Sequence, residues 1–231
     1  GLNQNERVIY ISGWEEPKKV QKAMEVANVD VKIYEKNDAL KFISCKRWYM
    51  ISGEVDATYM GLWQKTLDET LSKGFRGLRI GSETNYLLAH HKMKELVEYE
   101  RACGKKLKLP ITVLCAYDLD QVKTLGEKFF LEIAKAHGHL LCADPEIGGD
   151  VVFKSVEEGL EKALGTVAKE MIFYNLKKRY ELEKEDISGK FMTLHEALED
   201  LFGIGVEPLE NMIFKELYSN FISRMCVKTR V

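Results

Sequence analysis

The alternation of hydrophobic and polar positions is most regular between residues 74 and 118, where it predicts a strand, a helix and a second strand. A short apolar run at 78–80 ends at the polar turn 81–85, whose Ser, Thr and Asn residues can cap a following helix. From residue 86 to 103 apolar residues recur every three or four positions, which is typical of an amphipathic helix. The continuous apolar run 111–117 indicates a strand covered on both faces. Together these elements predict a right-handed βαβ unit of a parallel sheet.

The amino-terminal part of the chain predicts further strands and helices of the same sheet. Residues 29–34 alternate apolar and polar side chains with period two, as a half-exposed strand does, and the run 39–44 is expected to pair with them. The remaining expected elements are strands at 8–12 and 48–52 and helices at 17–27 and 57–72.

After residue 118 the pattern becomes helical. The expected elements are a helix at 118–136, a short strand at 139–142, an edge strand or lead-in at 151–153, and helices at 156–180, 193–202 and 207–223. The segment 143–150 contains proline and glycine and is the best candidate for a linker. The fold class predicted is therefore α/β, a mainly parallel sheet flanked by helices in residues 1–150, followed by a small all-helical domain in residues 151–231.

Composition excludes several classes of function. The 231 residues include 34 basic and 36 acidic side chains, so the chain has no overall field that would attract DNA or an anionic membrane. No apolar stretch approaches the roughly twenty residues that span a bilayer, and no secretory signal precedes Arg7, so we expect a cytoplasmic protein without a membrane span. The five cysteines form no C-x-x-C pair, which predicts reduced thiols and no structural zinc.

A phosphate-binding loop of the kind used by P-loop ATPases is missing. The single near match, residues 148–155, has Phe153 in place of the second glycine, and it would follow a linker instead of a core strand. ATP hydrolysis by the standard P-loop mechanism is therefore not expected.

The candidate ligand site lies where the predicted parallel strands end, because ligands of open parallel sheets bind beyond the carboxyl ends of the strands. The candidate ligand-binding residues are Ser12, Trp14, Glu54, Glu83, Tyr117 and Asp118. Glu83 and Asp118 could accept hydrogen bonds or bind a cation; the alternative is that they are helix-start carboxylates favoured by the helix dipole. Trp14 and Trp48 could form an apolar wall for a ligand, or they could close the core.

Other reactive or charged residues receive structural interpretations. Cys115 lies within a predicted buried strand and is expected to be an inert thiol. Arg79, also in a predicted strand, needs a partner, for which Glu83 and Glu100 are the candidates. The basic run 177–179 is followed at once by acidic residues, so direct nucleic-acid binding is not expected. No catalytic residue and no metal ligand is predicted.

Several short segments occur in the order seen in one known family. They are Gly1-Leu2, Glu6 to Ile11, Gly77 to Glu83, Tyr99-Glu100, Leu114 to Asp118, and His137. As an ordered set they resemble the MEDS family, a sensory domain named for methanogens, methylotrophs and a dichloromethane-responsive regulator, over residues 1–144.

The resemblance implies a RecA-like or KaiC-like core that has lost its nucleotide-hydrolysing loop and acts as a sensor or interaction module in transcriptional and two-component signalling. Family members usually carry another strand ahead of Gly1, so the sheet is expected to leave an edge for another chain or the tail to cap. The helical tail is similar to a small domain of archaeal proteins.

The sequence therefore predicts a non-enzymatic sensory or regulatory protein that binds a small metabolite or nucleotide at the strand ends. A homo-oligomer formed through the helical region and a signalling protein partner are expected, and no particular cofactor is indicated. One alternative is an enzyme, either a degenerate nucleotide-binding protein or a metal-assisted hydrolase using Glu83 and Asp118. Another is a pure protein-interaction adaptor.

Overall fold

The computed structural model describes residues 1–13, 17–49, 59–106, 110–137 and 145–228. Its contacts divide the chain into two compact units, unit 1 (Gly1–Gln121) and unit 2 (Val122–Val231), and each is described by itself. The domain boundary expected at residue 150 stays a prediction. None of the described helices is both long and apolar enough to cross a lipid bilayer.

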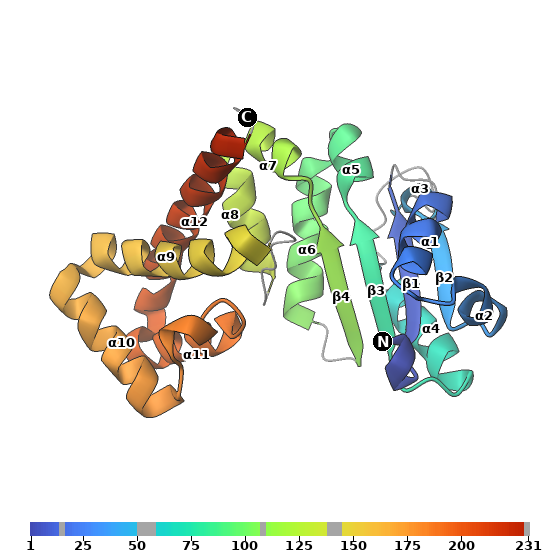
Figure 1. The fold of residues 1–231 in the computed structure, drawn as a ribbon, viewed down its shortest axis with the longest axis horizontal. Helices are drawn as coiled ribbons and strands as arrows, with labels where there is room; N and C mark the ends of the chain where they lie inside the picture. The colour runs from blue at the N-terminus through green and yellow to red at the C-terminus, as the bar shows by residue number, and fades with distance from the viewer. Residues whose placement is uncertain (14–16, 50–58, 107–109, 138–144, 229–231) are drawn as a thin grey trace. The chain divides into compact units, whose positions relative to one another are not determined.

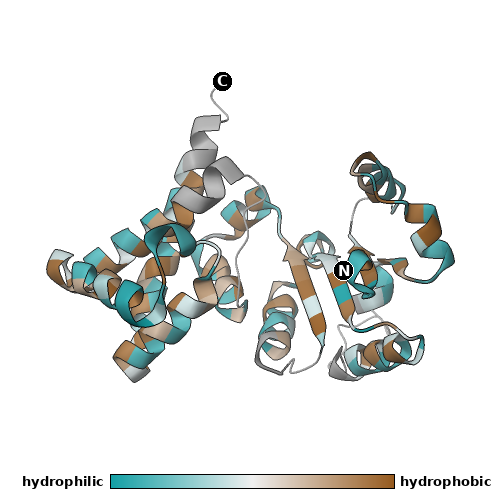
Figure 2. Cartoon of the chain, turned by 60° about the horizontal axis from the view of Figure 1, so that its bottom comes forward, coloured by the Kyte–Doolittle hydropathy of each residue, from teal (hydrophilic) through white to brown (hydrophobic). Residues whose placement is uncertain are grey.

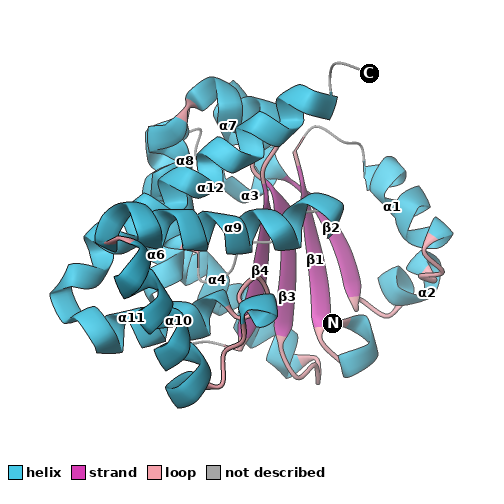
Figure 3. Cartoon of the chain, turned by 60° about the vertical axis from the view of Figure 1, so that its left-hand side comes forward, coloured by secondary structure: helices cyan, strands magenta, loops and turns pink. Residues whose placement is uncertain are grey.

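Unit 1 is built on a parallel sheet, as predicted (Figure 1). Its strands are β1 (Arg7–Ser12), β2 (Leu40–Ser44), β3 (Leu78–Glu83) and β4 (Ile111–Ala116). They lie in the order β2-β1-β3-β4, and every neighbouring pair is parallel, as Figure 3 shows. The α/β class and the expected βαβ unit that ends in β4 are confirmed.

Two helices of unit 1 cover one face of this sheet. The described helices of the unit are α1 (Pro17–Val26), α2 (Val31–Lys36), α3 (Cys45–Tyr49), α4 (Tyr59–Ser72), α5 (Asn85–Ala89), α6 (Met93–Lys106) and the first residues of α7 (Leu119–Leu125). Glu69 of α4 contacts Arg7 of β1 at 3.1 Å, which places α4 on the sheet. The rings of Trp63 in α4 and Tyr99 in α6 stack with centroids 6.5 Å apart, so α6 lies beside α4.

The two faces of the sheet differ in burial. On the face beneath α4 and α6, Ile9, Ile11 and Ile80 are at most 1% exposed. On the opposite face alternate residues of β3 and β4 are partly or fully exposed, and Leu114 is 54% exposed. The expectation that β4 is buried on both faces was therefore wrong, because alternate residues of β4 are exposed on its second face.

One predicted strand is a helix, and the described part of another lies in a helix. Residues 29–34 were expected to form a strand, but Asp30 caps α2 by accepting a hydrogen bond from the Ile33 N–H at 3.1 Å. The run 39–44, which forms β2, therefore has no strand at 29–34 to pair with, and it pairs with β1 instead. The strand expected at 48–52 begins within α3, and its residues 50–52 lie outside the described part of the chain.

Every regular element described in unit 2 is a helix, which confirms the helical carboxyl-terminal region. Its elements are α7 from Val122 onward, α8 (Glu127–Ala136), α9 (Pro145–Leu164), α10 (Thr166–Tyr180), α11 (Phe191–Phe202) and α12 (Val206–Lys228), with single 3-10 turns at Lys184–Asp186 and Gly203–Gly205. Apolar and polar residues are interleaved along these helices (Figure 2), and their apolar sides form one core.

Glycines interrupt two helices that were predicted to be continuous. Gly126 (φ 86°) separates α7 from α8, and Gly165 (φ 83°) separates α9 from α10. Both have a positive φ, which glycine adopts without strain. The helix axis therefore changes direction at the glycine, while the spacing of apolar residues along the sequence continues through it.

Helix α9 also corrects the expectations for residues 145–155. Pro145–Asp150, expected as a linker, and residues 151–153, expected as an edge strand or lead-in, are helical, as is the near match to a P-loop. The strand expected at 139–142 lies outside the described residues.

Helices α9 and α12 approach each other unusually closely. A Cβ atom added to Gly159 of α9 would lie 2.7 Å from the Cα and 2.9 Å from the N of Ile213 in α12. Glycine is therefore the residue that fits this crossing, because any side chain would meet backbone.

Candidate ligand site at the carboxyl edge of the sheet

The strand order identifies a switch point between β1 and β3. From β1 the chain moves to β2 on one side, and it then returns across β1 to β3 and continues to β4 on the other side. In open α/β sheets, ligands bind at such a switch point, in the crevice outside the carboxyl ends of the strands. Ser12 and Gly13 at the end of β1 and Glu83 at the end of β3 border this point, which we call the carboxyl edge.

Glu83 is the central polar residue of the carboxyl edge. Its Oε1 accepts a hydrogen bond from the Tyr10 hydroxyl at 2.6 Å, and its Oε2 accepts one from the Gly13 backbone N–H at 2.8 Å. The side chain is half-buried, and no basic side chain in the described ranges forms an ion pair with it. A carboxylate oxygen can accept more than one hydrogen bond, so acceptor capacity remains for a ligand that donates.

Gly13 is shaped by this carboxylate. A Cβ atom at position 13 would lie 3.2 Å from Glu83 Oε2 and 3.3 Å from Glu83 Cβ, which is tighter than ordinary van der Waals contact. Glycine therefore lets the backbone N–H after β1 reach Glu83, and a larger residue would displace the carboxylate.

The ends of β2 and β4 are attached to the same strand. The Cys45 thiol, directly after β2, donates to the Glu83 carbonyl oxygen at 2.9 Å. The Thr84 hydroxyl donates to the Ala116 carbonyl oxygen of β4 at 2.9 Å. Burial, with a further contribution from the charge of Glu83, raises the pKa of Cys45 to about 12, so this thiol is a protonated hydrogen-bond donor.

Tyr117 and Asp118 follow β4 but make local contacts. The Tyr117 hydroxyl donates to Glu100 Oε1 on α6 at 2.7 Å. Asp118 Oδ1 accepts hydrogen bonds from the N–H groups of Asp120 and Gln121 at 2.9 and 3.1 Å. Asp118 thus has the geometry of the helix-start carboxylate that was weighed as its alternative role.

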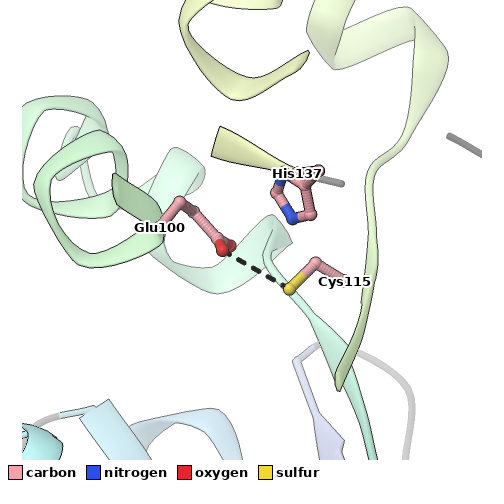
Figure 4. Close-up of side chains that lie close together, drawn as sticks. All are labelled: Glu100, Cys115 and His137. Atoms are coloured by element: carbon pink, nitrogen blue, oxygen red, sulfur yellow. Dashed lines mark hydrogen bonds between the residues drawn. The ribbon is translucent and has the colours of Figure 1, made fainter. Parts of the chain in front are cut away.

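Cys115 fits the expectation of an inert thiol. Its Sγ donates to Glu100 Oε2 at 3.5 Å, and Glu100 itself is only 3% exposed (Figure 4). Burial, together with the charge of Glu100, raises the pKa of Cys115 well above its ordinary value.

The arginine partners differ from the prediction. Arg79 pairs with Glu6 at 2.8 Å, and neither Glu83 nor Glu100 is its partner in an ion pair among the described residues. The arginine that is buried is Arg7, at 1% exposure, which sequence reasoning did not single out because it begins a strand beside a polar segment.

Of the six predicted site residues, Ser12 and Glu83 border the carboxyl edge, Tyr117 and Asp118 lie after β4, and Trp14 and Glu54 are outside the described residues. The structure adds Tyr10, Gly13 and Cys45 to the contacts of Glu83. A glycine directly after a strand was the one signal in the sequence that could have indicated Gly13.

The family described as the methanogen/methylotroph, DcmR sensory domain (MEDS) has a model that matches residues 1–138. The searches of curated proteins and of solved structures found no significant match.

Proposed function

The chain belongs to the MEDS family of sensory domains, and from this we propose that it is a non-enzymatic regulatory protein whose carboxyl edge binds a small metabolite. The observation that carries the proposal is Glu83, an acidic group placed at the switch point of a parallel sheet without a cationic partner among the described residues. The chain would then report binding of the metabolite to a signalling protein partner.

The charge of Glu83 selects the chemistry of the ligand. A carboxylate bordering the crevice repels phosphate and carboxylate groups, and it attracts ammonium groups or N–H and O–H donors. We therefore favour a small metabolite with a positive or hydrogen-bond-donating group over a nucleotide.

The contacts of Glu83 also suggest how binding would be transmitted. A ligand that donates to Glu83 competes with the Tyr10 hydroxyl and the Gly13 N–H, which are its present donors. Release of the Gly13 N–H would change the hydrogen bonds at the end of β1. Ligand binding would thereby alter the carboxyl edge itself, which a partner could recognise.

The proposal is tested by native mass spectrometry of freshly purified protein, which retains small non-covalent ligands. The wild type is expected to carry a discrete small adduct that Glu83→Gln lacks. Glu98→Gln is the matched control, because Glu98 is an exposed acid of α6 with the same charge and size. Adduct-free wild type that also fails to bind any member of a panel of small amines and alcohols saturably would overturn the proposal.

A further inference from the structure

Helix α10 of unit 2 carries apolar side chains on two opposite sides. One side is buried in the core of the unit and consists of Ile172, Phe173 and Leu176. On the other side Val167, Met171 and Tyr174 are 77%, 61% and 63% exposed. We call these three exposed residues the α10 stripe. A helix that is apolar on opposite sides is normally buried on both, so the α10 stripe is expected to be covered by another surface.

Exposed apolar side chains gather at the α10 stripe and are scattered elsewhere. Leu164, the last residue of α9, precedes the stripe in the chain and is 40% exposed. Elsewhere in the described ranges each exposed large apolar side chain lies alone on its own helix, strand or turn. Single apolar side chains are ordinary on protein surfaces, whereas a contiguous group marks an interaction site. Tyrosine and methionine are also enriched at protein–protein interfaces.

The shape of this surface fits a second helix. Among the side chains that line a surface hollow on α10 are Val167, Glu170, Met171 and Tyr174. They stand at positions i, i+3, i+4 and i+7, the spacing of the four residues that receive one side chain of a facing helix in knobs-into-holes packing. The α10 stripe can therefore receive side chains of a partner helix without a change in its own backbone.

The two halves of α10 carry opposite charges beside the stripe. Glu170 is 57% exposed and contacts Lys169 at 3.6 Å, but the same ammonium contacts Glu161 at 2.9 Å, so one positive charge is shared between carboxylates. Lys178 continues the stripe four residues after Tyr174, and it forms no ion pair with any residue that the structure describes. The surface is therefore negative in the amino-terminal half of the helix and positive in the carboxyl-terminal half.

From these features we infer that the α10 stripe binds the α10 stripe of a second copy of this chain, with the two helices antiparallel. A twofold axis turns one helix end for end, so Met171 of each copy packs against Tyr174 of the other. Lys178 then lies three residues, about 4.5 Å along the helix, from Glu170 of the second copy, which a lysine side chain can span. The parallel arrangement would instead place Lys178 beside Lys178 and align the two helix dipoles.

The inference goes beyond the proposed ligand site, because the α10 stripe lies in unit 2 and includes no residue of the carboxyl edge. It is tested by sedimentation velocity of the full chain over a range of concentrations. Interfaces that bury less than about 1,200 Å2 associate transiently, and a single helix stripe belongs to this small class. The wild type is therefore expected to pass reversibly from monomer to dimer at micromolar concentrations.

Met171→Glu is expected to raise the Kd of the dimer by at least about tenfold, because a charge would be buried against Tyr174 of the second copy. Val167→Glu provides a second stripe variant in case Met171→Glu does not fold. Met93→Glu is the matched control, since it makes the same substitution at another exposed methionine, in α6.

The antiparallel arrangement has a test of its own. Glu170→Lys and Lys178→Glu each place like charges opposite one another, and each is expected to raise the Kd about fivefold to tenfold, because the pair occurs twice in a symmetric dimer. In a mixed dimer of the two variants both pairs are attractive again. An equimolar mixture is therefore expected to dimerise about as tightly as the wild type.

Three results would overturn the inference. A wild type that stays monomeric at hundreds of micromolar has no such contact with a second copy. If the dimers of Met171→Glu and Val167→Glu are as tight as that of Met93→Glu, the copies meet at another surface. If the mixture of the two charge variants dimerises no better than either variant alone, the helices are not paired in the antiparallel arrangement.

Discussion

The crossing of α9 and α12 makes Gly159→Ala a sensitive test of the packing in unit 2. The added methyl carbon would lie 2.7 Å from Ile213 Cα, 2.9 Å from Ile213 N and 2.9 Å from Ile213 Cγ1. Two of these three atoms belong to the backbone, so a side-chain rotation cannot relieve the clash. The helices would have to move apart, and the core that they share would lose contacts.

The magnitude follows from two opposing effects. Alanine is favoured over glycine in a helix by about 1 kcal/mol, which alone would stabilise the variant. Overpacking a well-packed core costs about 1–3 kcal/mol, and a clash with backbone belongs at the upper end of that range. The net expectation is a loss of about 1–2 kcal/mol in the free energy of unfolding, which shifts a urea midpoint by about 0.5–1 M.

The assay is urea unfolding followed by far-UV circular dichroism and by tryptophan emission. The three tryptophans, Trp14, Trp48 and Trp63, all lie in unit 1, so their emission reports that unit while circular dichroism reports both. Gly159→Ala should lower the midpoint of the circular dichroism transition. The control is Gly61→Ala in α4, where an added Cβ meets nothing within 4 Å and a gain of up to about 1 kcal/mol is expected.

A Gly159→Ala variant that is as stable as the wild type, or more stable, would refute the reasoning, because helix propensity would then outweigh the crossing. A variant in which Ile213→Ala fully restores the loss would also contradict it, since that truncation removes Cγ1 but leaves the two backbone atoms in place.

Two further predictions concern ionisation in unit 1. Burial alone would raise the pKa of Asp38, but hydrogen bonds from Lys73 and Arg7 outweigh burial and lower it. Hydrogen bonds from the same two residues also lower the pKa of Glu69. The stability that these two carboxylates contribute is present above the ordinary carboxyl pKa values and is lost as the pH falls below about 4.5. In Asp38→Asn the free energy of unfolding should therefore depend less on pH in acid. An unchanged pH dependence in urea titrations would disprove this. Burial raises the pKa of Cys45 from 9.0 to about 12, so its thiolate population is about 1,000-fold lower than normal. Iodoacetamide at mildly alkaline pH should therefore leave Cys45 unmodified until urea is added. Mass spectrometry of the peptides measures this modification.

The elements predicted correctly are those with clear signals at both ends. The unit from β3 to β4 has a polar turn before its helical segment and a proline before its second strand, and both strands were recognised. The single helix expected at 86–103 is instead two helices, α5 and α6, and Thr84 before α5 makes no side-chain capping bond. Residues 29–34 were misread because their alternation fits a strand, while the capping bond of Asp30 favours a helix. The run that forms β4, ITVLCA, contains no charged residue, so its composition could not reveal that one face is open.

The candidate site was predictable only in part, for a related reason. Glu83 stands at the end of a strand, and parallel topology alone placed it at the carboxyl edge. Its donors Tyr10 and Gly13 lie 73 and 70 positions away in the chain, and only the strand register brings them together. The buried Arg7 depends on Asp38 and on a helix from another part of the sequence, so no local pattern marked it.

The order of the strands has a consequence for synthesis of the chain. β1 lies between β2 and β3, and the bond from Tyr10 to Glu83 spans 73 positions. Ribosomes add about 5–20 residues per second, so β1 leaves the exit tunnel roughly 4–15 seconds before its second neighbour. During that interval one edge of β1 carries unpaired backbone groups and apolar side chains. Chaperones that shield extended apolar segments would therefore act at β1 during this interval, and codons that slow translation between β2 and β3 would lengthen its exposure.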